Sequence, residues 1–287
     1  MRKNLLDLSG KISDFIIVVL EVISDVANNL SIPFFVIGAT ARDILLNNYY
    51  GIKTERATYD IDLGISVETW NIFENLTESL IATGNFKKIK SPQRLFYKDK
   101  FPVDIVPFGQ ISDPKNSIKW PPNNEIEMST LGFKESYDHS VLVRLKSNPK
   151  LEVKFASLCG LALMKIISWD EKYPERSKDA KDLDFIMRNY IYAGNEERVY
   201  DEESDLFEGE NFDYEYMSSR LLGRDIALMS EPKTKDKIRN ILNHQTGKRT
   251  RYRMVEDMMR SNSVFRNDFE EKLNLLEELK KGLLERL

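Results

Sequence analysis

Two short strands, separated by a glycine turn and a helix, are predicted in the first quarter of the chain. Residues 34–37 are apolar and rich in strand formers, and Gly38 follows them directly, which predicts a buried strand entering a turn. Residues 41–47 predict a short helix capped by Thr40. Residues 58–64 alternate polar and apolar side chains, as a strand with one buried face does. This order predicts a sheet with helices packed against it.

Three aspartates lie in strand-like segments. Asp60 and Asp62 are two residues apart, so a strand places both side chains on one face, roughly 6.5–7 Å apart. Asp104 is the one charged residue in the apolar run 101–106. If the two segments are neighbours in the sheet, three carboxylates converge. We therefore predict that Asp60, Asp62 and Asp104 are catalytic and bind metal.

Convergence of carboxylates requires a counter-charge. Two like charges about 4 Å apart repel by about 4 kcal/mol at an effective dielectric of 20. Mg²⁺ or Mn²⁺ relieves this repulsion, since hard cations bind carboxylates together with substrate phosphates. The structural alternatives are a strand-edge pair bound by turns for Asp60 and Asp62, and a salt bridge for Asp104.

The turn after the first strand suits phosphate binding. Gly38, Ala39 and Thr40 are small enough for backbone N–H groups to approach phosphate oxygens. Arg42 follows one turn into the predicted helix, where it either reaches a triphosphate or forms an ordinary surface pair with Asp43. Neither a Walker A loop nor a G-x-G-x-x-G motif is present in the sequence.

Beyond residue 110 the pattern changes. After loop signals, a hairpin is predicted near 141–153, and from Ser157 the pattern is helical almost to the end. The fold class is therefore α+β: a small mixed sheet flanked by helices, followed by a mainly helical C-terminal region. We place the domains at 1–110 and 111–287. The amphipathic segment 269–287 predicts a helix that packs on the body or on a partner.

Composition narrows the class of protein. The net charge of −4 argues against non-specific coating of nucleic acid, which requires a broad cationic face. Cys159 is the single cysteine; it excludes an intramolecular disulfide and fits a small buried side chain better than a nucleophile. The strongest apolar run, 15–20, is far shorter than the roughly 20 residues of a membrane span. We expect a cytoplasmic protein with no membrane partner.

Three motifs together resemble the nucleotidyltransferase motif set of the DNA polymerase β superfamily. They are the Gly-Ala-Thr-Ala-Arg-Asp of 38–43, the Asp-Ile-Asp-Leu of 60–63 and the Val-Asp-Ile-Val-Pro-Phe of 103–108. The resemblance implies a nucleotidyltransferase sheet and a nucleoside triphosphate substrate. Ala39 departs from the pattern, because the superfamily usually has Gly or Ser there, and this removes one hydroxyl contact from the implied phosphate grip.

Two further motifs are similar to those of the AbiEii group, the nucleotidyltransferase toxins of abortive-infection and toxin–antitoxin systems. Lys165 lies in an otherwise apolar helix, and Lys-Asp-Ala-Lys-Asp occupies 178–182. By this resemblance Lys165 contacts the triphosphate, and Lys178 and Asp179 complete the pocket. The alternatives are a lysine that snorkels to the surface for Lys165 and first-turn capping after Ser177 for the other two.

The resemblance implies an enzyme that moves a nucleoside monophosphate from an NTP to a hydroxyl and releases pyrophosphate. A tRNA 3′ end or a protein hydroxyl is the implied acceptor, and a toxin would have a cognate antitoxin as partner. The basic segment 233–253, interleaved with Tyr252 and His244, either suits RNA or is a solvated face that balances the acidic stretch 196–215. The competing classes are a non-catalytic nucleotide-binding regulator and a protein adenylyltransferase that acts as an antitoxin.

Overall fold

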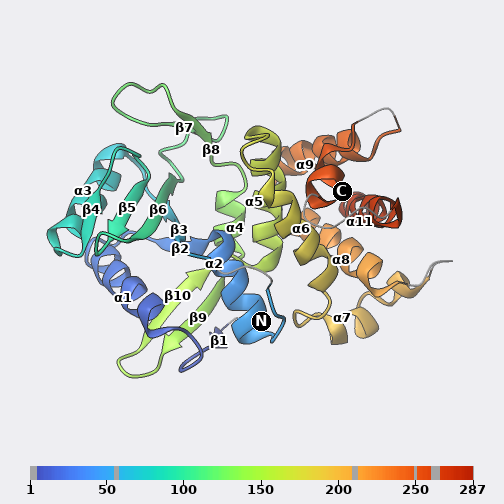
Figure 1. The fold of residues 1–287 in the computed structure, drawn as a ribbon, viewed down its shortest axis with the longest axis horizontal. Coiled ribbons are helices and arrows are strands. Elements are labelled where there is room, and N and C mark those ends of the chain that lie inside the picture. The colour runs from blue at the N-terminus through green and yellow to red at the C-terminus, as the bar shows by residue number, and fades with distance from the viewer. Residues whose placement is uncertain (1–4, 55–57, 209–212, 249–250, 260–265, 287) are drawn as a thin grey trace. The chain divides into compact units, whose positions relative to one another are not determined.

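The computed structural model describes residues 5–54, 58–208, 213–248, 251–259 and 266–286. The chain forms two compact units, Met1–Ser157 and Leu158–Leu287, coloured from blue to green and from yellow-green to red in Figure 1. The first unit contains the strands and the second contains helices only, over the described residues.

The first unit is built on an eight-stranded mixed sheet of order β1-β9-β10-β2-β3-β6-β5-β4 (Figure 1). Its strands are β1 Leu5–Asp7, β2 Phe34–Ile37, β3 Ile61–Ser66, β4 Phe86–Lys88, β5 Arg94–Tyr97, β6 Phe101–Phe108, β9 Val141–Lys146 and β10 Leu151–Phe155. Its other elements are α1 Asp14–Asn29, α2 Gly38–Asp43, the π-helix η1 Ile44–Tyr49, α3 Trp70–Ala82, α4 Phe133–Asp138, and the separate hairpin of β7 Ser117–Lys119 and β8 Glu127–Ser129.

The mixed sheet flanked by helices confirms the predicted fold class, but the sheet is larger than the small one expected. The hairpin of β9 and β10 joins it, because β10 pairs in parallel with β2 and places Phe155 beside Val36. Both side chains are fully buried, so this pairing extends the core across the hairpin. The first compact unit accordingly runs to Ser157, whereas the sequence placed a domain boundary at residue 110.

The helix after the first strand begins earlier than predicted, at Gly38 rather than residue 41. Thr40 lies inside it and does not cap it; its hydroxyl donates instead to the carbonyl oxygen of Asp60, at 2.5 Å. This hydrogen bond, which takes the place of the predicted cap, is a tertiary contact, since Asp60 is twenty residues further along the chain.

The second unit consists of α5 Leu158–Glu171, α6 Lys178–Asn189, α7 Glu196–Asp201, the 3₁₀ helix η2 Ser204–Phe207, α8 Tyr214–Met229, α9 Pro232–Thr246, α10 Arg253–Met259 and α11 Arg266–Glu285. The predicted terminal amphipathic helix is α11, and it packs on α8. Their backbones approach closely: a Cβ at Gly223 would lie 2.1 Å from the carbonyl oxygen of Leu279, and Ser219 donates to that of Leu275. The helix thus packs on the body of the second unit, as one of the two predicted roles requires.

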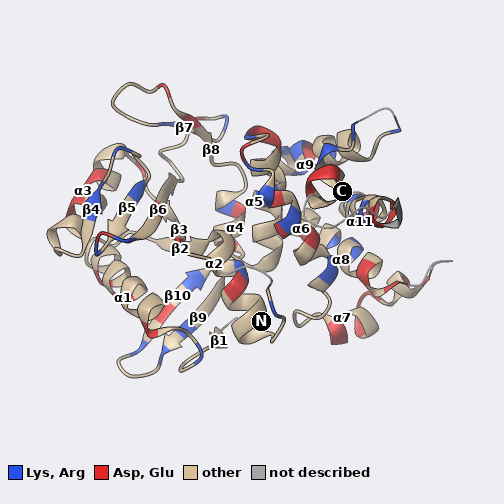
Figure 2. Ribbon diagram, in the orientation of Figure 1, with Lys and Arg blue, Asp and Glu red and all other residues tan. Residues whose placement is uncertain are grey.

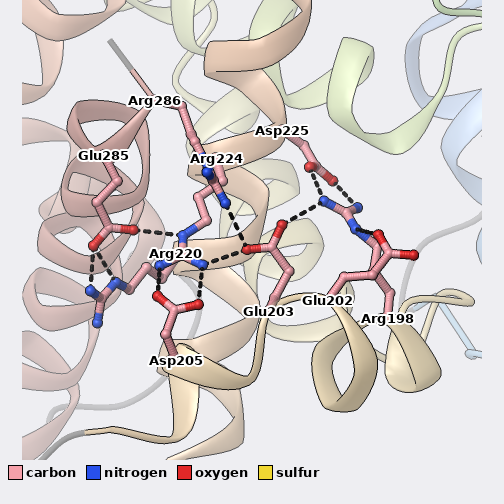
Figure 3. Close-up of polar contacts among 9 residues, drawn as sticks. All are labelled: Arg198, Glu202, Glu203, Asp205, Arg220, Arg224, Asp225, Glu285 and Arg286. Carbon is pink, nitrogen blue, oxygen red and sulfur yellow. Dashed lines mark hydrogen bonds and ion pairs between the residues drawn. The ribbon is translucent and has the colours of Figure 1, made fainter.

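Acidic residues lie on α7 (Figure 2), and ion pairs connect the helices of the second unit, as between Arg198 of α7 and Asp225 of α8. Arg224 of α8 is 2% exposed and binds three carboxylates, those of Glu203, Asp205 and Glu285 (Figure 3). Arg198 and Arg286 also contact Glu203. The acidic stretch is thus ordered over its described residues and is bound in part by these arginines.

Among the described residues, no helix combines the length and apolarity that a membrane crossing requires.

Candidate active site

The central feature of the first unit is a row of polar residues across adjacent strands. Asp62 of β3 is in register with Asp104 of the parallel strand β6, and with Ile37 of β2 on its other side. Each aspartate is half-buried and has buried apolar neighbours along its own strand. Residues in register share a face of the sheet, so the two carboxylates lie side by side, as the sequence predicted if the strands were neighbours.

Asp60 lies just before the first residue of β3 and not within the strand. It is half-buried, and its backbone carbonyl accepts the hydroxyl hydrogen bond from Thr40. The position of Asp60 therefore depends on α2 as well as on the sheet.

A second anchor holds the same segment. Thr58 donates to Oδ2 of Asp43 at 2.6 Å, and the Oδ1 atom of Asp43 accepts from Nε and Nη2 of Arg42 at 2.8 and 2.6 Å. Arg42 is only 5% exposed, so its pairing with Asp43 is buried and is not the surface pair considered from the sequence. This chain of contacts ties the helix after Gly38 to the residues that precede Asp60.

Gly38 occupies a position that only glycine suits. Its φ is +71°, a left-handed conformation that costs other residues roughly 1–2 kcal/mol. A Cβ built there would lie 2.0 Å from Oδ2 of Asp62, which is sterically impossible without displacing that carboxylate. Ala39 follows as a half-buried residue. The turn therefore places the backbone of Gly38, which has no side chain, next to the carboxylate of Asp62, a predicted metal ligand.

Arg94, which sequence reasoning did not single out, is the cation of this site. It lies on β5 in register with Asp104, and its Nε and Nη2 atoms donate to the two carboxylate oxygens of Asp104, both at 2.6 Å. These hydrogen bonds raise the pKa of Arg94, and the charges of Asp104, Asp60 and Asp62 add to that effect against partial burial. All three predicted aspartates therefore act on one guanidinium.

The sequence contains a signal that could have located this arginine. Three residues join β5 to β6, and Tyr97 pairs with Phe101 across the turn. Counting back three positions from Tyr97 and forward three from Phe101 reaches Arg94 and Asp104. The salt-bridge alternative considered for Asp104 is thus present in the structure.

The three aspartates fit a divalent cation in the type of their donors. Carboxylate oxygens are the ligands that Mg²⁺ prefers, and Asp62 and Asp104 are adjacent while both oxygens of Asp104 bind a positive charge. Within the described part of the chain, no three His, Cys, Asp or Glu side chains are already gathered as a metal centre. The roles of the three aspartates therefore stay predictions.

The remaining predicted residues, Lys165, Lys178 and Asp179, lie in the second unit. Lys165 on α5 is 6% exposed, and its Nζ lies 3.2 Å from Oδ1 of Asp179 and 2.5 Å from Oδ2 of Asp182. The ammonium is buried in this ion cluster, so Lys165 does not snorkel to the surface. Asp179 also accepts from Arg176, whereas Lys178 is exposed at the start of α6. Ser177 makes no side-chain capping bond.

The cysteine fits no catalytic role in this arrangement. Cys159 is buried, and its thiol contacts the sulfur of Met229 at 3.2 Å. Burial raises the pKa of the thiol well above its ordinary value, which keeps it protonated.

The fold and the motif residues are those of a nucleotidyltransferase, and a family model confirms this class. The model described as "Nucleotidyl transferase AbiEii toxin, Type IV TA system" matches residues 22–274, most of the chain. The chain therefore belongs to this family. No curated protein matches the sequence.

Several solved structures resemble the chain at low identity. ANT(2")-Ia in complex with adenylyl-2"-tobramycin is 14% identical with a TM-score of 0.36, over 65% of this chain and 99% of that one. The CCA-adding enzyme in apo form II is 13% identical with a TM-score of 0.32, over 91% and 71%. The Thermotoga maritima CCA-adding enzyme complexed with tRNA is 13% identical with a TM-score of 0.27, over 97% and 83%. The assignment of this chain rests on the family model.

Proposed function

We propose that the protein transfers a nucleoside monophosphate from an NTP to a hydroxyl acceptor, with Asp60, Asp62 and Asp104 holding Mg²⁺ or Mn²⁺. In this reaction the acceptor oxygen bonds to the α-phosphorus, the bond to the bridging oxygen breaks, and the acceptor proton and pyrophosphate leave. The observation that carries the proposal is the register of Asp62 with Asp104, beside a glycine that leaves the Asp62 carboxylate its space.

These residues have different roles in the proposed reaction. Asp62 and Asp104 are supplied by neighbouring strands, while Thr40 and Asp43 position the segment that carries Asp60. The backbone N–H groups at Gly38 and Ala39 would approach the phosphate oxygens, as the motif resemblance implies. When bound, the divalent cation would activate the acceptor hydroxyl and stabilise the departing pyrophosphate.

The decisive experiment offers the purified protein each labelled NTP with Mg²⁺ or Mn²⁺, in the presence of total tRNA or of a protein lysate. We expect label to move to one acceptor class with the wild type and with Asp138→Asn, whose exposed carboxylate forms an ion pair with Lys134 on the same helix, α4. Asp62→Asn should show no transfer. Equal labelling by Asp62→Asn and wild type would overturn the assignment of the site.

RNA is the acceptor class favoured by the basic segment 233–253. Lys248 and Arg251 are exposed, whereas Lys237 pairs with Asp170 of α5 and Arg253 lies over the ring of Tyr173. Figure 2 shows the basic residues of α9. Arg249, the other arginine of this segment's distal end, lies outside the described residues.

Salt dependence tests that acceptor class. Each phosphate contact adds about one unit to the slope of log affinity against log salt. Lys248→Ala/Arg251→Ala should reduce the slope for tRNA by about two units, while Lys281→Ala, which removes a lysine paired with Glu278 on α11, should leave it unchanged. An unchanged slope in the double variant would favour a protein acceptor.

Family membership also supports a toxin role with a cognate antitoxin. Expression of the wild-type chain in a bacterial host should then slow growth, and Asp62→Asn expressed to the same level should not. Equal growth of both strains at equal protein levels would contradict the toxin role. It would not bear on nucleotidyl transfer, which the labelling experiment tests.

A further inference from the structure

The contact between Arg94 and Asp104 involves the same carboxylate oxygens that the proposed metal would bind. Both oxygens of Asp104 accept hydrogen bonds of 2.6 Å from one guanidinium. The carboxylate is 16% exposed and the arginine 35% exposed, so the pair sits at the edge of the core and can still exchange with solvent. Bidentate arginine–carboxylate pairs are the stronger class of ionic hydrogen bond.

This contact is fixed by the sheet and is not an accident of a flexible surface side chain. Arg94, Asp104 and Asp62 are in register across β5, β6 and β3, so they form one row on one face. The pairing register of β5 with β6 places Arg94 on this face, because a slip of one residue would turn Arg94 to the other face.

Arg94 places a positive charge beside the proposed metal ligands. Its guanidinium is hydrogen-bonded to Asp104, and it also interacts electrostatically with Asp60 and Asp62. A divalent cation held by Asp104 would bind an oxygen that Arg94 contacts, and the two positive charges would repel each other at that short distance. Arg94 and the metal therefore compete for the same ligand.

We propose that Arg94 is a resident counter-ion that keeps Asp104 paired in the metal-free protein, and that metal binding displaces it from Asp104. Arg94 is thus a positioning residue that acts through Asp104. The proposal rests on the proposed function, since it takes the three aspartates as the metal ligands. It adds that the Arg94–Asp104 pair lowers the affinity of the protein for metal and stabilises the folded site in the absence of metal.

The test compares Mn²⁺ binding by calorimetry in the wild type, Arg94→Gln, Arg94→Lys and Lys87→Met. Arg94→Gln removes the charge and should bind Mn²⁺ about tenfold more tightly, because the metal no longer breaks a charge-assisted pair. Arg94→Lys keeps the charge without the bidentate fork and should lie between the two. Lys87→Met removes an exposed lysine of the neighbouring strand β4 and should match the wild type.

Thermal unfolding supplies the second readout. In EDTA, Arg94→Gln should unfold at a lower temperature than the wild type, and saturating Mn²⁺ should raise its midpoint by more than it raises that of the wild type. Weaker Mn²⁺ binding by Arg94→Gln would overturn the proposal, as would affinity equal to the wild type, since the first assigns Arg94 a supporting role and the second none.

The same titrations separate this inference from the proposed function. If the wild type binds no Mn²⁺, or if Asp62→Asn binds it equally well, the metal site itself is wrong and the counter-ion role is lost with it. If the wild type binds Mn²⁺ through Asp62 and Arg94→Gln binds no more tightly, only the counter-ion role is wrong.

Discussion

The carboxylate of Asp62 lies where a side chain on Gly38 would have to be: a Cβ at Gly38 would stand 2.0 Å from its Oδ2 atom. The glycine also has a φ of +71°. Gly38 therefore meets two independent physical requirements, and the steric one directly concerns Asp62, a proposed metal ligand.

We expect Gly38→Ala to reduce nucleotidyl transfer about 100-fold, because even a displacement of about 1 Å at a reacting centre has an effect of that size. The matched control is Gly84→Ala, which has a φ of +75° but open space around its Cβ. Both variants should lose about 1–2 kcal/mol of stability from backbone strain, measured by urea unfolding. Comparable activity losses in the two would show that strain alone, and not Asp62, explains the effect.

Asp104→Asn should abolish transfer and also lower the stability of the metal-free protein, by about 1 kcal/mol, since Arg94 loses its charged partner. Repulsion among the aspartates taken alone would have predicted a gain in stability. Unfolding in EDTA decides between the two, with Asp138→Asn as the control. A stabilised Asp104→Asn protein would mean that repulsion outweighs the contact with Arg94.

The buried cluster around Lys165 should be structurally important. Lys165→Met leaves the buried carboxylate of Asp179 with one fewer cationic donor, and we expect a loss of about 1–3 kcal/mol. Lys178→Met, an exposed lysine at the start of α6, should change stability by no more than about 0.5 kcal/mol. Urea unfolding of both variants at neutral pH makes the comparison, and equal effects would count against the cluster.

Arg224 should make stability depend on acid pH. Hydrogen bonds from Arg224 lower the pKa of Asp205. Burial raises the pKa of Glu203, but the hydrogen bond from Arg224 and the charges of Arg224, Arg286 and Arg198 together outweigh it, so this pKa is lowered as well. Because these folded-state pKa values are depressed, their contribution is present above the ordinary carboxyl pKa of about 4 and is lost as the pH falls below it.

Arg224→Met should therefore lose about 3 kcal/mol near pH 7, as buried pairs do when one partner is removed. The difference from the wild type should shrink as the pH is lowered below about 4. Arg239→Met, which breaks an exposed pair with Asp236, should cost no more than about 1 kcal/mol at any pH. If the stability difference between Arg224→Met and the wild type does not change with pH, the carboxylates are not its cause.

The contact of α8 with α11 predicts a steric effect. Gly223→Ala would place a methyl group 2.1 Å from the carbonyl oxygen of Leu279, on backbone that cannot yield cheaply. We expect Gly223→Ala to lose about 1–3 kcal/mol of stability from overpacking. Leu284→Ala, at a position on α11 that is 43% exposed, should change stability only slightly. Thermal unfolding of the two variants is sufficient, and a neutral Gly223→Ala would mean that the helices separate readily.

The sequence by itself determined those parts that depend on local pattern. The strand before Gly38, the strands that carry Asp62 and Asp104, and the helical second half all follow from periodicity and turn residues, since backbone propensity and alternation act over a few neighbours. The motif residues also sufficed for the class of enzyme, which the family match confirms.

Only the tertiary structure decided which of these elements meet. The pairing of β10 with β2, the bond from Thr40 to the carbonyl of Asp60, and the burial of Lys165 between two aspartates join residues 14 to about 120 positions apart. The choice of Arg94 as the partner of Asp104 belongs with them, because strand register places one arginine among many beside that carboxylate. Local pattern leaves such partners open, since many pairings satisfy the same alternation and packing of the whole sheet selects one.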